Sequence, residues 1–417
     1  MNQTANLPVT PSVKRAILSV NSGSSTIKFA LYEVVQEGVG SVLISGAVEG
    51  LQPGGTAQMS FRCGDEAWTS ALPANGADSF SAALGFLREQ LKTHNGGTEV
   101  IAVAHRIVHG GDRCAASMVI DKPTLSYLRS LHHLAPLHQP HNLDGVEAFA
   151  QTFPDVPQIG CFDTGFHASM PVRERSFALP NALTEAGIRR YGFHGLSYRF
   201  VSSRLFQVSA VAGRRVLMAH LGNGASLCAM QGGISVATTM GFSALDGLMM
   251  GSRCGALDPG VLLHLLQGGW DAKKIETTLY KQSGLLGVSG ISADMRTLRA
   301  STEASAKAAI ELFTYRIIRE AGGLIAVMNG IDAIAFTGGI GEHDAALRAD
   351  VAAGLAYLGV TVNPAKNRQA TGDEVCAIHA EGSGPEVWVI PTDEGRIAAM
   401  DAARLLGFPV VFPSGGH

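Results

Sequence analysis

Four residues of this chain combine side chains suited to phosphoryl transfer with unusually apolar surroundings. Arg106 lies in VAHRIVHGG and Arg253 in GLMMGSRCGALDPG. A guanidinium binds carboxylate or phosphate through paired hydrogen bonds, and more strongly where little water competes. Asp163 and Glu394 each follow an apolar run, so we expect both carboxylates at strand ends, where open α/β folds bind ligands. One or two carboxylates suit Mg²⁺ at a phosphate site, although ion pairing or helix capping would explain each residue alone.

Three glycine-containing turns offer backbone donors for phosphate groups. The first, residues 21–26 in LSVNSGSSTIKFALYE, also carries hydroxyls and is followed by Lys28, although an ordinary tight turn is the alternative. The second is residues 222–226 in VLMAHLGNGASLCAM. The third, residues 338–341 in AIAFTGGIGEHD, links a strand to a helix start. It is not a dinucleotide fingerprint, since Asp344 replaces the last glycine, and the absence of GxxxxGK[ST] from the chain disfavours a P-loop fold.

Histidines are concentrated near these segments. LHHLAPLHQPH suggests zinc, but its prolines break any helix, no cysteine is near, and the spacing matches no usual ligand set, so zinc is disfavoured. His138 in this stretch is better suited to donate to an anion. His194, in RRYGFHGLSYRF, lies between an aromatic residue and glycines, where a buried structural histidine is the ordinary alternative.

An α/β framework is expected to position these residues, because short apolar runs alternate with longer helical patterns. We expect strands at residues 16–20, 27–32, 100–105, 158–162, 216–221, 226–230, 331–336 and 387–390. The strongest helical pattern covers residues 302–329, with Gly322 and Gly323 marking a close packing contact. Another helix begins at Pro123 and continues to Pro136.

The first two turns share one plan: apolar strand, turn of Asn, Gly and Ser, apolar strand. This internal repeat predicts a duplicated domain with a nucleotide clamped between the copies. A length of 417 residues also suggests two domains.

Composition excludes several other classes of protein. Hydrophobic residues make up 46% and charged residues 16%, which is typical of a compact fold, and 32 basic against 35 acidic residues leave no field for nucleic acid or an anionic membrane. The six cysteines form no CxxC pair, so we expect reduced thiols. The N-terminal stretch lacks the apolar core of a signal peptide, and no run reaches the roughly 20 apolar residues that span a bilayer, so we expect a cytoplasmic protein.

Taken together, these motifs resemble the acetate kinase family, within the acetate and sugar kinase, Hsp70 and actin superfamily. The resemblance covers nearly the whole chain. It rests on NSGSSTIKF, AHRIVHGG, LAPLHQPHN, CFDTGFH, RRYGFHGLSY, HLGNGAS, MGFSALDGLMMGSRCGALDPG, SGLLGVSGISADMR, FTGGIGEH and IPTDEG, in this order along the sequence.

The resemblance implies an α/β fold of duplicated ribonuclease H-like (actin-like ATPase) domains with the active site in the cleft between them. Residues 1–165 plus 396–417 would form the first domain, and residues 166–395 the second, carrying most of the nucleotide site. The implied reaction is reversible transfer of the γ-phosphoryl group of ATP to acetate, with Mg²⁺ or alternatively Mn²⁺, by a homodimer.

The resemblance also implies a role for individual residues of this sequence. Catalytic roles fall to Asp163, His194, Arg253 and Arg106, and the acetate site comprises Arg106, Val108, Leu137, Phe193 and Ala244. The implied nucleotide-binding residues are Lys28, Ser24, Thr26, His138, His220, Leu221, Gly222, Asn223, Gly224, Asp294, Met295, Arg296, Gly339, Ile340, Gly341, Glu342 and His343, and the metal ligands are Asn21 and Glu394. Because acetate is already an anionic nucleophile, we expect Asp163 to fix the metal or orient the arginines rather than act as a general base.

Several residues depart from the family pattern. Ala244 replaces a common proline, so the pocket is expected to be roomier, and propionate or another short-chain carboxylate is the alternative substrate. Ala256 replaces a common acid, His343 replaces a common Asn at the nucleotide loop, and residues 393–395 read Asp-Glu-Gly where Asn-Glu-Glu is more usual. Asp393 could therefore add charge at the metal site. A non-catalytic nucleotide switch is a distant alternative, because such a protein would not need Arg106, Arg253 and His194.

Overall fold

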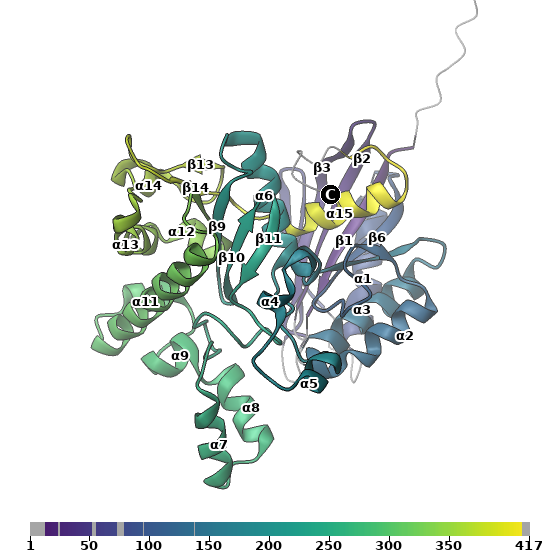
Figure 1. Cartoon of the computed structure of the whole chain (residues 1–417). Helices are drawn as coiled ribbons and strands as arrows, with labels where there is room; N and C mark the ends of the chain where they lie inside the picture. Colours follow the sequence, from purple (N-terminus) through teal and green to yellow (C-terminus); the bar gives the residue numbers. More distant parts are fainter. Residues whose placement is uncertain are drawn as a thin grey trace, which may run out of the picture.

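The protein is described by a computed structural model over residues 13–23, 26–51, 56–72, 79–94, 96–136 and 138–410. It is an α/β protein built on two sheets (Figure 1). The first sheet has eight strands in the order β5-β4-β3-β2-β1-β6-β8-β7, and the second has six in the order β11-β10-β9-β12-β14-β13. The strands are β1 (Arg15–Ser22), β2 (Thr26–Val35), β3 (Gly38–Glu49), β4 (Gln58–Cys63), β5 (Glu66–Ala71), β6 (Glu99–Ile107), β7 (Met118–Val119), β8 (Gln158–Phe162), β9 (Arg215–Leu221), β10 (Ala225–Gln231), β11 (Ile234–Thr238), β12 (Ala333–Thr337), β13 (Cys376–Ala377) and β14 (Glu386–Val389).

The two sheets repeat one topology. In the first, β3, β2 and β1 form an antiparallel meander, and β6 and β8 continue the sheet in parallel. In the second, β11, β10 and β9 form the meander, and β12 and β14 continue it in parallel. The predicted repeat of strand, turn and strand is therefore the β1–β2 hairpin and its counterpart β9–β10. Two sheets of one topology agree with the expected fold class, an α/β protein of duplicated domains.

Helices cover both sheets and one of them faces both halves. The α-helices are α1 (Ser79–His94), α2 (Lys122–Ser130), α3 (Gln139–Thr152), α4 (Val172–Arg175), α5 (Asn181–Glu185), α6 (Gly195–Val208), α7 (Pro259–Gln267), α8 (Ala272–Lys281), α9 (Gly284–Ser289), α10 (Met295–Ala300), α11 (Ala304–Val327), α12 (Gly338–His343), α13 (Ala345–Gly354), α14 (Pro364–Gln369) and α15 (Glu394–Leu405). Near the C-terminus of the chain, α15 packs against β1 and β6. Helix α6 contacts α15, β8 and β9, and so lies between the halves. The domain boundaries at residues 165 and 396 stay a prediction.

Helix α11 follows its predicted pattern, since Ala306, Ile310, Phe313, Ile317, Ala321 and Leu324 are all buried against the second sheet. The expected close contact at its glycines is wrong. A Cβ on Gly322 would meet only the Tyr357 hydroxyl, at 3.9 Å, and a Cβ on Gly323 would meet nothing within 4 Å. The helix expected to run from Pro123 to Pro136 is also shorter than expected: α2 ends at Ser130, and a 3-10 turn follows at His132–Leu134.

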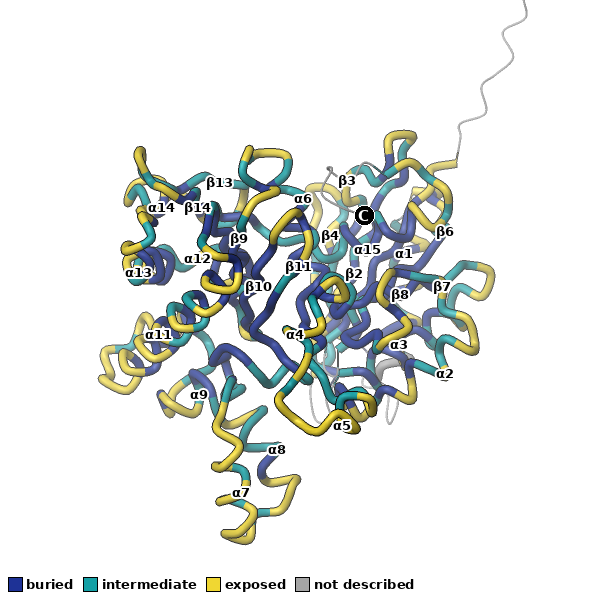
Figure 2. The backbone as a smooth tube through the Cα atoms, viewed as in Figure 1, coloured by how far each residue is buried: buried dark blue, intermediate teal, exposed yellow. Residues whose placement is uncertain are grey.

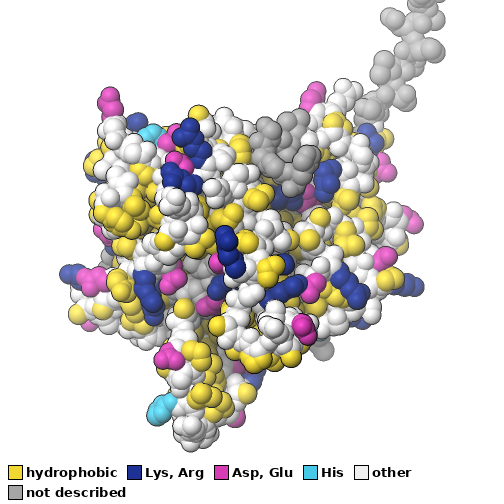
Figure 3. Space-filling view, viewed as in Figure 1, with side chains coloured by type: hydrophobic (Ala, Val, Ile, Leu, Met, Phe, Trp, Pro, Cys, Tyr) yellow, Lys and Arg dark blue, Asp and Glu magenta, His cyan; other side chains and the backbone are white. Residues whose placement is uncertain are grey.

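The buried part of the molecule consists mainly of the strands, and α7 is the clearest contrast to them (Figure 2). Helices α7 and α8 project away from both sheets, and no residue of α7 is buried. On the face shown in Figure 3, basic and acidic side chains are interspersed, as a net charge of −3 leads one to expect. Within the described residues, no helix combines the length and apolar character that crossing a bilayer requires.

Candidate active site

Arg106 and Asp163 meet at the carboxyl ends of two parallel strands. Residue Arg106 is the last but one of β6, and Asp163 directly follows β8, its amide donating to the Ile107 carbonyl at 3.0 Å. Because parallel strands end at the same sheet edge, the two side chains face each other. Arg106 Nε donates to Asp163 Oδ1 at 3.1 Å, and Nη2 donates to Oδ2 at 2.5 Å. This bidentate contact fixes the plane of the guanidinium.

Glu394 reaches the same guanidinium from α15, with its Oε2 3.1 Å from Arg106 Nε. The sequence placed this carboxylate at a strand end, but β14 stops at Val389 and Glu394 is the first residue of α15. The helix is capped by Asp393, which accepts from the Arg396 amide at 2.9 Å and from the Tyr32 hydroxyl at 2.8 Å. The carboxylate of Asp393 is thus engaged in positioning α15.

Burial and charge set the ionisation of this group of three. The side chain of Asp163 is 2% exposed, against 21% for Arg106 and 22% for Glu394. Burial raises the pKa of Asp163 and Glu394 raises it further, while Arg106 opposes the rise. Burial alone would lower the pKa of Arg106, but the two carboxylates raise it above its ordinary value. The guanidinium is therefore a permanent cation that both acids hold in place.

Arg253 lies near this centre and is held quite differently. Its Nη1 donates to the Ala244 carbonyl at 2.5 Å, and within the described residues no carboxylate lies within ion-pairing distance of it. Burial lowers the pKa of Arg253, and the nearby Arg106 lowers it further. A desolvated guanidinium whose charge meets no anionic partner among the described residues is suited to bind an anionic ligand.

Gly224 brings Arg253 and His194 to one point. A Cβ added to Gly224 would lie 2.8 Å from Arg253 Nη2 and 3.3 Å from His194 Nε2, so a larger residue would intrude between these two side chains. The turn after β9 therefore has to be glycine here for reasons of space. The β9–β10 hairpin therefore places its backbone directly against the side chains of Arg253 and His194.

His194 precedes α6 in the left-handed conformation, with φ +60°. Its ring stacks on His220 at a centroid distance of 4.2 Å, and its Nδ1 lies 2.9 Å from Ser226 Oγ. Burial lowers the pKa of His194 well below the ordinary value, and His220, Arg106 and Arg253 add to this effect. The imidazole is therefore neutral at pH 7, and it can donate a hydrogen bond from only one nitrogen.

His138 and His220 are also neutral at pH 7. His138 precedes α3, and burial lowers its pKa to about 4, assisted by Arg253 and Arg106. Burial likewise lowers the pKa of His220 to about 4, and its Nδ1 lies 2.8 Å from Ser197 Oγ. The structure thus brings His138 and His194 into the electrostatic surroundings of both arginines.

In the first sheet, next to β6, the β1–β2 hairpin presents Asn21 and Lys28. These residues are direct cross-strand partners, so their side chains leave the same face of the sheet. Lys28 is exposed, while Asn21 and Thr26 are half-buried. Of the other predicted contact residues, Ser24 and Leu137 lie outside the described residues.

The second and third glycine segments lie against each other. A Cβ on Gly222 would be 3.8 Å from the Gly339 amide nitrogen, and Gly338 has φ +76° and packs on the Leu221 carbonyl. The expected turn at residues 338–341 is wrong in form, because α12 begins at Gly338 without an intervening loop. No side chain would be met at Gly339 within 4 Å, so this backbone is open to a ligand.

Not every residue predicted at the nucleotide has a free side chain. The Glu342 carboxylate accepts from the Gly338 amide at 2.8 Å and from the Thr392 amide at 3.0 Å, so it ties α12 to the segment before Glu394. Asp294 caps α10 and forms an ion pair with the exposed Arg296 at 2.6 Å. This hydrogen bonding lowers the pKa of Asp294 to about 2. The remaining predicted nucleotide residues that are exposed include Asn223 and His343.

Three of the predicted pocket residues share one apolar cluster. Val108 and Phe193 are buried in it, and Ala244 packs against it partly buried. Two fully buried residues next to the site, Ser226 and Tyr198, were given no side-chain role from the sequence. Ser226 was expected only as the last residue of the second glycine-containing turn and the first of a strand, which is β10, and short polar residues of that kind are common in strands.

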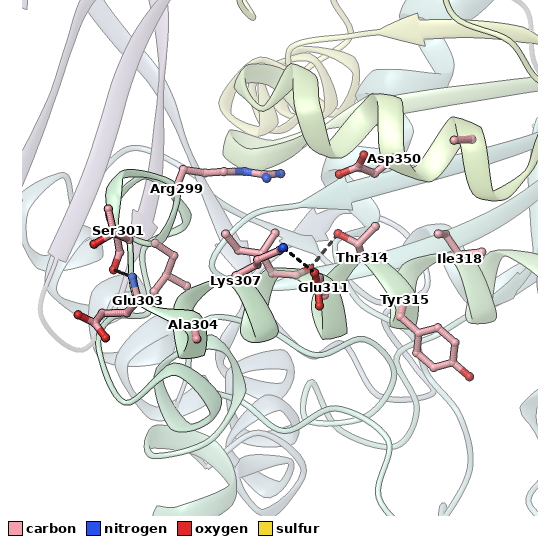
Figure 4. Close-up of a pocket in the computed structure, with 14 residues that line it drawn as sticks. Arg299, Ser301, Glu303, Ala304, Lys307, Glu311, Thr314, Tyr315, Ile318 and Asp350 are labelled. Atoms are coloured by element: carbon pink, nitrogen blue, oxygen red, sulfur yellow. Dashed lines mark hydrogen bonds and ion pairs between the residues drawn. The ribbon is translucent and has the colours of Figure 1, made fainter.

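A separate cavity of about 730 Å³ lies between α10, α11 and α13 (Figure 4). Its lining includes Lys307, Glu311 and Asp350, and Arg299 at its edge is paired with Asp344 at 3.0 Å. Lys307 and Glu311 lie 3.9 Å apart, one helical turn from each other. None of the predicted catalytic residues lines this cavity, so it is distinct from the Arg106 centre.

Comparison with known proteins agrees with this geometry. Residues 16–400 match the Acetokinase family. An acetate kinase of Rhodopseudomonas palustris is 48% identical over 395 residues, which is 93% of this chain and 98% of that protein. The structure of a propionate kinase from Francisella tularensis has a TM-score of 0.85 and 33% identity, covering 93% of this chain and 98% of that one. The Porphyromonas gingivalis acetate kinase has a TM-score of 0.84 and 34% identity, with coverage of 94% and 100%. The chain therefore belongs to the acetokinase family, and it is a kinase.

Proposed function

We propose that this kinase transfers the γ-phosphoryl group of ATP reversibly to acetate, giving acetyl phosphate and ADP by direct in-line transfer. The observation that carries the proposal is the pair of half-buried arginines: Arg106 is oriented by Asp163 and Glu394, while Arg253 has no acid partner among the described residues and meets His194 at Gly224. Two cations and a donor around one point are what a reaction between anions needs.

The chemical demand on such a site is electrostatic. An acetate carboxylate is already a nucleophile, so the barrier lies in bringing two anions together and aligning them. In this mechanism Arg106 binds the carboxylate, and the bidentate contact with Asp163 keeps its guanidinium in one plane. Arg253 and the neutral His194 donate to the transferring phosphoryl group, where charge is spread over the equatorial oxygens in the transition state. Asp163 acts as an orienting group rather than a general base.

The apolar cluster and the glycine segments complete the assignment. Val108, Phe193 and Ala244 would receive the acetate methyl group. The backbone at Gly222 and Gly339, which lie against each other, would meet the phosphates, with Lys28 approaching from the first hairpin. Asp294 and Arg296, with residues 339–343, would surround the adenosine.

The chain also offers oxygen donors of the kind that Mg²⁺ and Mn²⁺ prefer, namely the Glu394 carboxylate and the Asn21 amide. The described residues contain no cluster of three or more His, Cys, Asp or Glu side chains able to enclose an ion, which suits a metal held largely by phosphate oxygens and water. When bound, such a cation neutralises charge on the β- and γ-phosphates. Glu394 and Asn21 would hold it.

A hydroxamate assay tests the proposal directly. Incubation with ATP, Mg²⁺, acetate and hydroxylamine should yield acetyl hydroxamate, and omission of either ATP or acetate should abolish it. No ATP-dependent product at saturating Mg²⁺ would contradict the proposal. Propionate belongs in the same assay as a second carboxylate, because Ala244 is smaller than the proline that is common at this position and a propionate kinase shares the fold. The comparison of kcat/KM for the two acids then assigns the preferred substrate.

The proposal includes a homodimer in the cytoplasm. Helix α7 (PGVLLHLLQ) carries no Asp, Glu, Lys or Arg, and Leu263 and Leu266 are 61% and 49% exposed. An uncharged apolar helix suits a second copy of itself, because a two-fold interface brings like patches together without charge repulsion. Consistent with a reducing compartment, all six cysteines are free thiols.

Sedimentation measurements test the dimer. The wild-type chain should sediment as a dimer of 43.6 kDa subunits, and Leu263→Glu with Leu266→Glu should give monomers. Val172→Glu, an exposed apolar residue on α4, is the matched control and should leave the dimer intact. A wild-type monomer would refute the dimer, and a dimeric double variant would remove α7 from the interface.

A further inference from the structure

His194 has one proton to place on two ring nitrogens, and the transferring phosphoryl group can use it only on one of them. Nδ1 points to Ser226 Oγ at 2.9 Å, away from the arginines. Nε2 points to the space beside Gly224 that Arg253 Nη2 also borders. If Nδ1 carried the proton, the nitrogen facing the phosphoryl oxygens would present a lone pair and repel them. The tautomer of His194 therefore decides whether the site works.

The first turn of α6 and the β9–β10 hairpin interlock around this ring. Ser226 and His220 are cross-strand partners, so their side chains lie on the same face of the second sheet. Tyr198, four residues after His194 on α6, reaches the same place, and its hydroxyl oxygen lies 2.5 Å from Ser226 Oγ. Tyr198 and Ser226 are both 0% exposed, so neither is in contact with bulk solvent.

The direction of these hydrogen bonds follows from the count of donors and acceptors. Tyr198 has one hydroxyl proton, and Ser226 is its only side-chain partner in the described residues. Burial raises the pKa of Tyr198 well above the ordinary value, so the phenol keeps this proton. If Ser226 donated to Tyr198 instead, the phenolic proton would be buried without an acceptor, which is unfavourable. Tyr198 therefore donates to Ser226, and Ser226 has its own proton left for His194 Nδ1.

We propose that Tyr198 and Ser226 form a hydrogen-bond relay that holds His194 in the Nε2–H tautomer, with that proton directed beside Arg253. Tyr198 and Ser226 are positioning residues, since they act on the reaction only through His194. No proton moves along the relay during turnover. The inference rests on the phosphoryl-binding role proposed above for His194. The first α6 turn repeats the device with Ser197 Oγ 2.8 Å from His220 Nδ1, so both stacked rings are oriented through the same nitrogen.

Nitrogen chemical shifts of ¹⁵N-histidine-labelled protein test the relay without reference to activity, with His194→Gln assigning the signal. Wild-type His194 should show a protonated Nε2 and an unprotonated Nδ1. Tyr198→Phe keeps the ring and removes the hydroxyl, and Ser226→Ala removes the group in contact with the imidazole. Both should move the two nitrogen shifts towards a mixture of tautomers and should lower kcat about tenfold to a hundredfold, with KM for acetate within about twofold.

Two further variants separate the outcomes. Ser226→Thr keeps a hydroxyl and should restore the wild-type shifts, whereas Tyr315→Phe removes a hydroxyl that is 60% exposed on α11 and should change neither shifts nor kcat. A wild-type His194 protonated on Nδ1, or unchanged shifts in both relay variants, would overturn the relay. Unchanged kcat in His194→Gln would instead overturn the proposed role of His194, while the shifts would still report whether Tyr198 and Ser226 fix the tautomer.

Discussion

Arg106 and Arg253 are held in opposite ways, although both side chains are half-buried close to one site. Arg106 has two carboxylates, one of them bidentate, whereas Arg253 has a single hydrogen bond to the Ala244 carbonyl and no acid partner among the described residues. A paired charge adds to stability once it is buried, and an unpaired one detracts from it. Arg106 and Arg253 therefore differ in what they contribute to folding and to catalysis.

The difference has a functional meaning. The charge of Arg106 is offset by two carboxylates, so its guanidinium is well oriented but binds an anion only weakly. This suits a substrate that must bind and leave. A desolvated guanidinium without a counter-ion attracts most strongly the group whose negative charge spreads over its oxygens in the transition state. Arg253 thus lowers the stability of the ligand-free protein but stabilises the transferring phosphoryl group.

Of the substitutions considered, Arg253→Met should have the largest effect on kcat. We expect kcat to fall about a thousandfold or more, as for transition-state arginines in other phosphoryl-transfer enzymes, with little change in KM for acetate. Stability should not fall, because the variant removes a buried unpaired cation while Met preserves much of the apolar stem. Steady-state kinetics and urea unfolding measure both. Near-normal kcat, or a clear loss of stability, would contradict the assignment.

Arg106→Met should harm both properties. Without the cation, the buried carboxylate of Asp163 loses its bidentate partner beside the half-buried Glu394, and we expect a loss of about 3–5 kcal/mol in the free energy of unfolding. We also expect kcat to fall about a hundredfold and KM for acetate to rise, since the residue binds the substrate and aligns it. Asp163→Asn is the control: it keeps the shape but loses the bidentate charge contact. Unchanged stability in Arg106→Met would remove the contrast with Arg253.

Much of this framework could be predicted from the sequence. The expected strand at residues 158–162 coincides with β8, and the long helix differs from α11 by only two residues at each end, because both lie in strongly apolar patterns with clear boundaries. The repeat of strand, turn and strand predicted the duplicated sheets. The expected place of Asp163 at a strand end is also correct, since it directly follows β8, but the parallel pairing that brings Arg106 to the same sheet edge was not predicted.

The contacts that distinguish the two arginines could not be predicted in the same way. The cap by Asp393 that aims Glu394, the carbonyl of Ala244 that holds Arg253, and the Tyr198–Ser226 contact join segments far apart in the sequence. Such contacts depend on side-chain packing, not on periodicity. The predicted close contact at Gly322 was wrong for the same reason, because a glycine in a helix does not reveal whether a neighbour is close.

Ala244→Pro tests whether residue 244, at the wall of the apolar pocket, limits the size of the acid. Proline keeps the backbone carbonyl that holds Arg253 and adds bulk at the apolar cluster that contains Val108 and Phe193. We expect kcat/KM for propionate to fall about tenfold relative to acetate, since one methylene in an apolar pocket is worth about 1–3 kcal/mol. Measuring both acids in the same enzyme preparation gives the ratio. An unchanged ratio would show that Ala244 does not limit the size of the acid.

The smallest effect concerns pH, and it tests how close each arginine comes to His138. Burial, then Arg253, then Arg106 lower the pKa of His138 to about 4, below the ordinary 6.5. A depressed pKa in the folded state means that the unfolded chain binds more protons between these values, so this contribution to stability is present above pH 6.5 and is lost as pH falls towards 4. One such group changes the free energy of unfolding by at most about 1.4 kcal/mol per pH unit.

Removing either arginine should reduce this slope by a fraction of that amount, and Arg253→Met should do so more than Arg106→Met. Both arginines also act on His194, and Arg106 acts on His220 and Asp163, so His138→Gln in each background is needed to isolate the contribution of His138. Urea unfolding at pH 7, 6 and 5 measures the slopes, and a His138-dependent slope that is steeper in Arg253→Met than in the wild type would place the Arg253 charge away from His138.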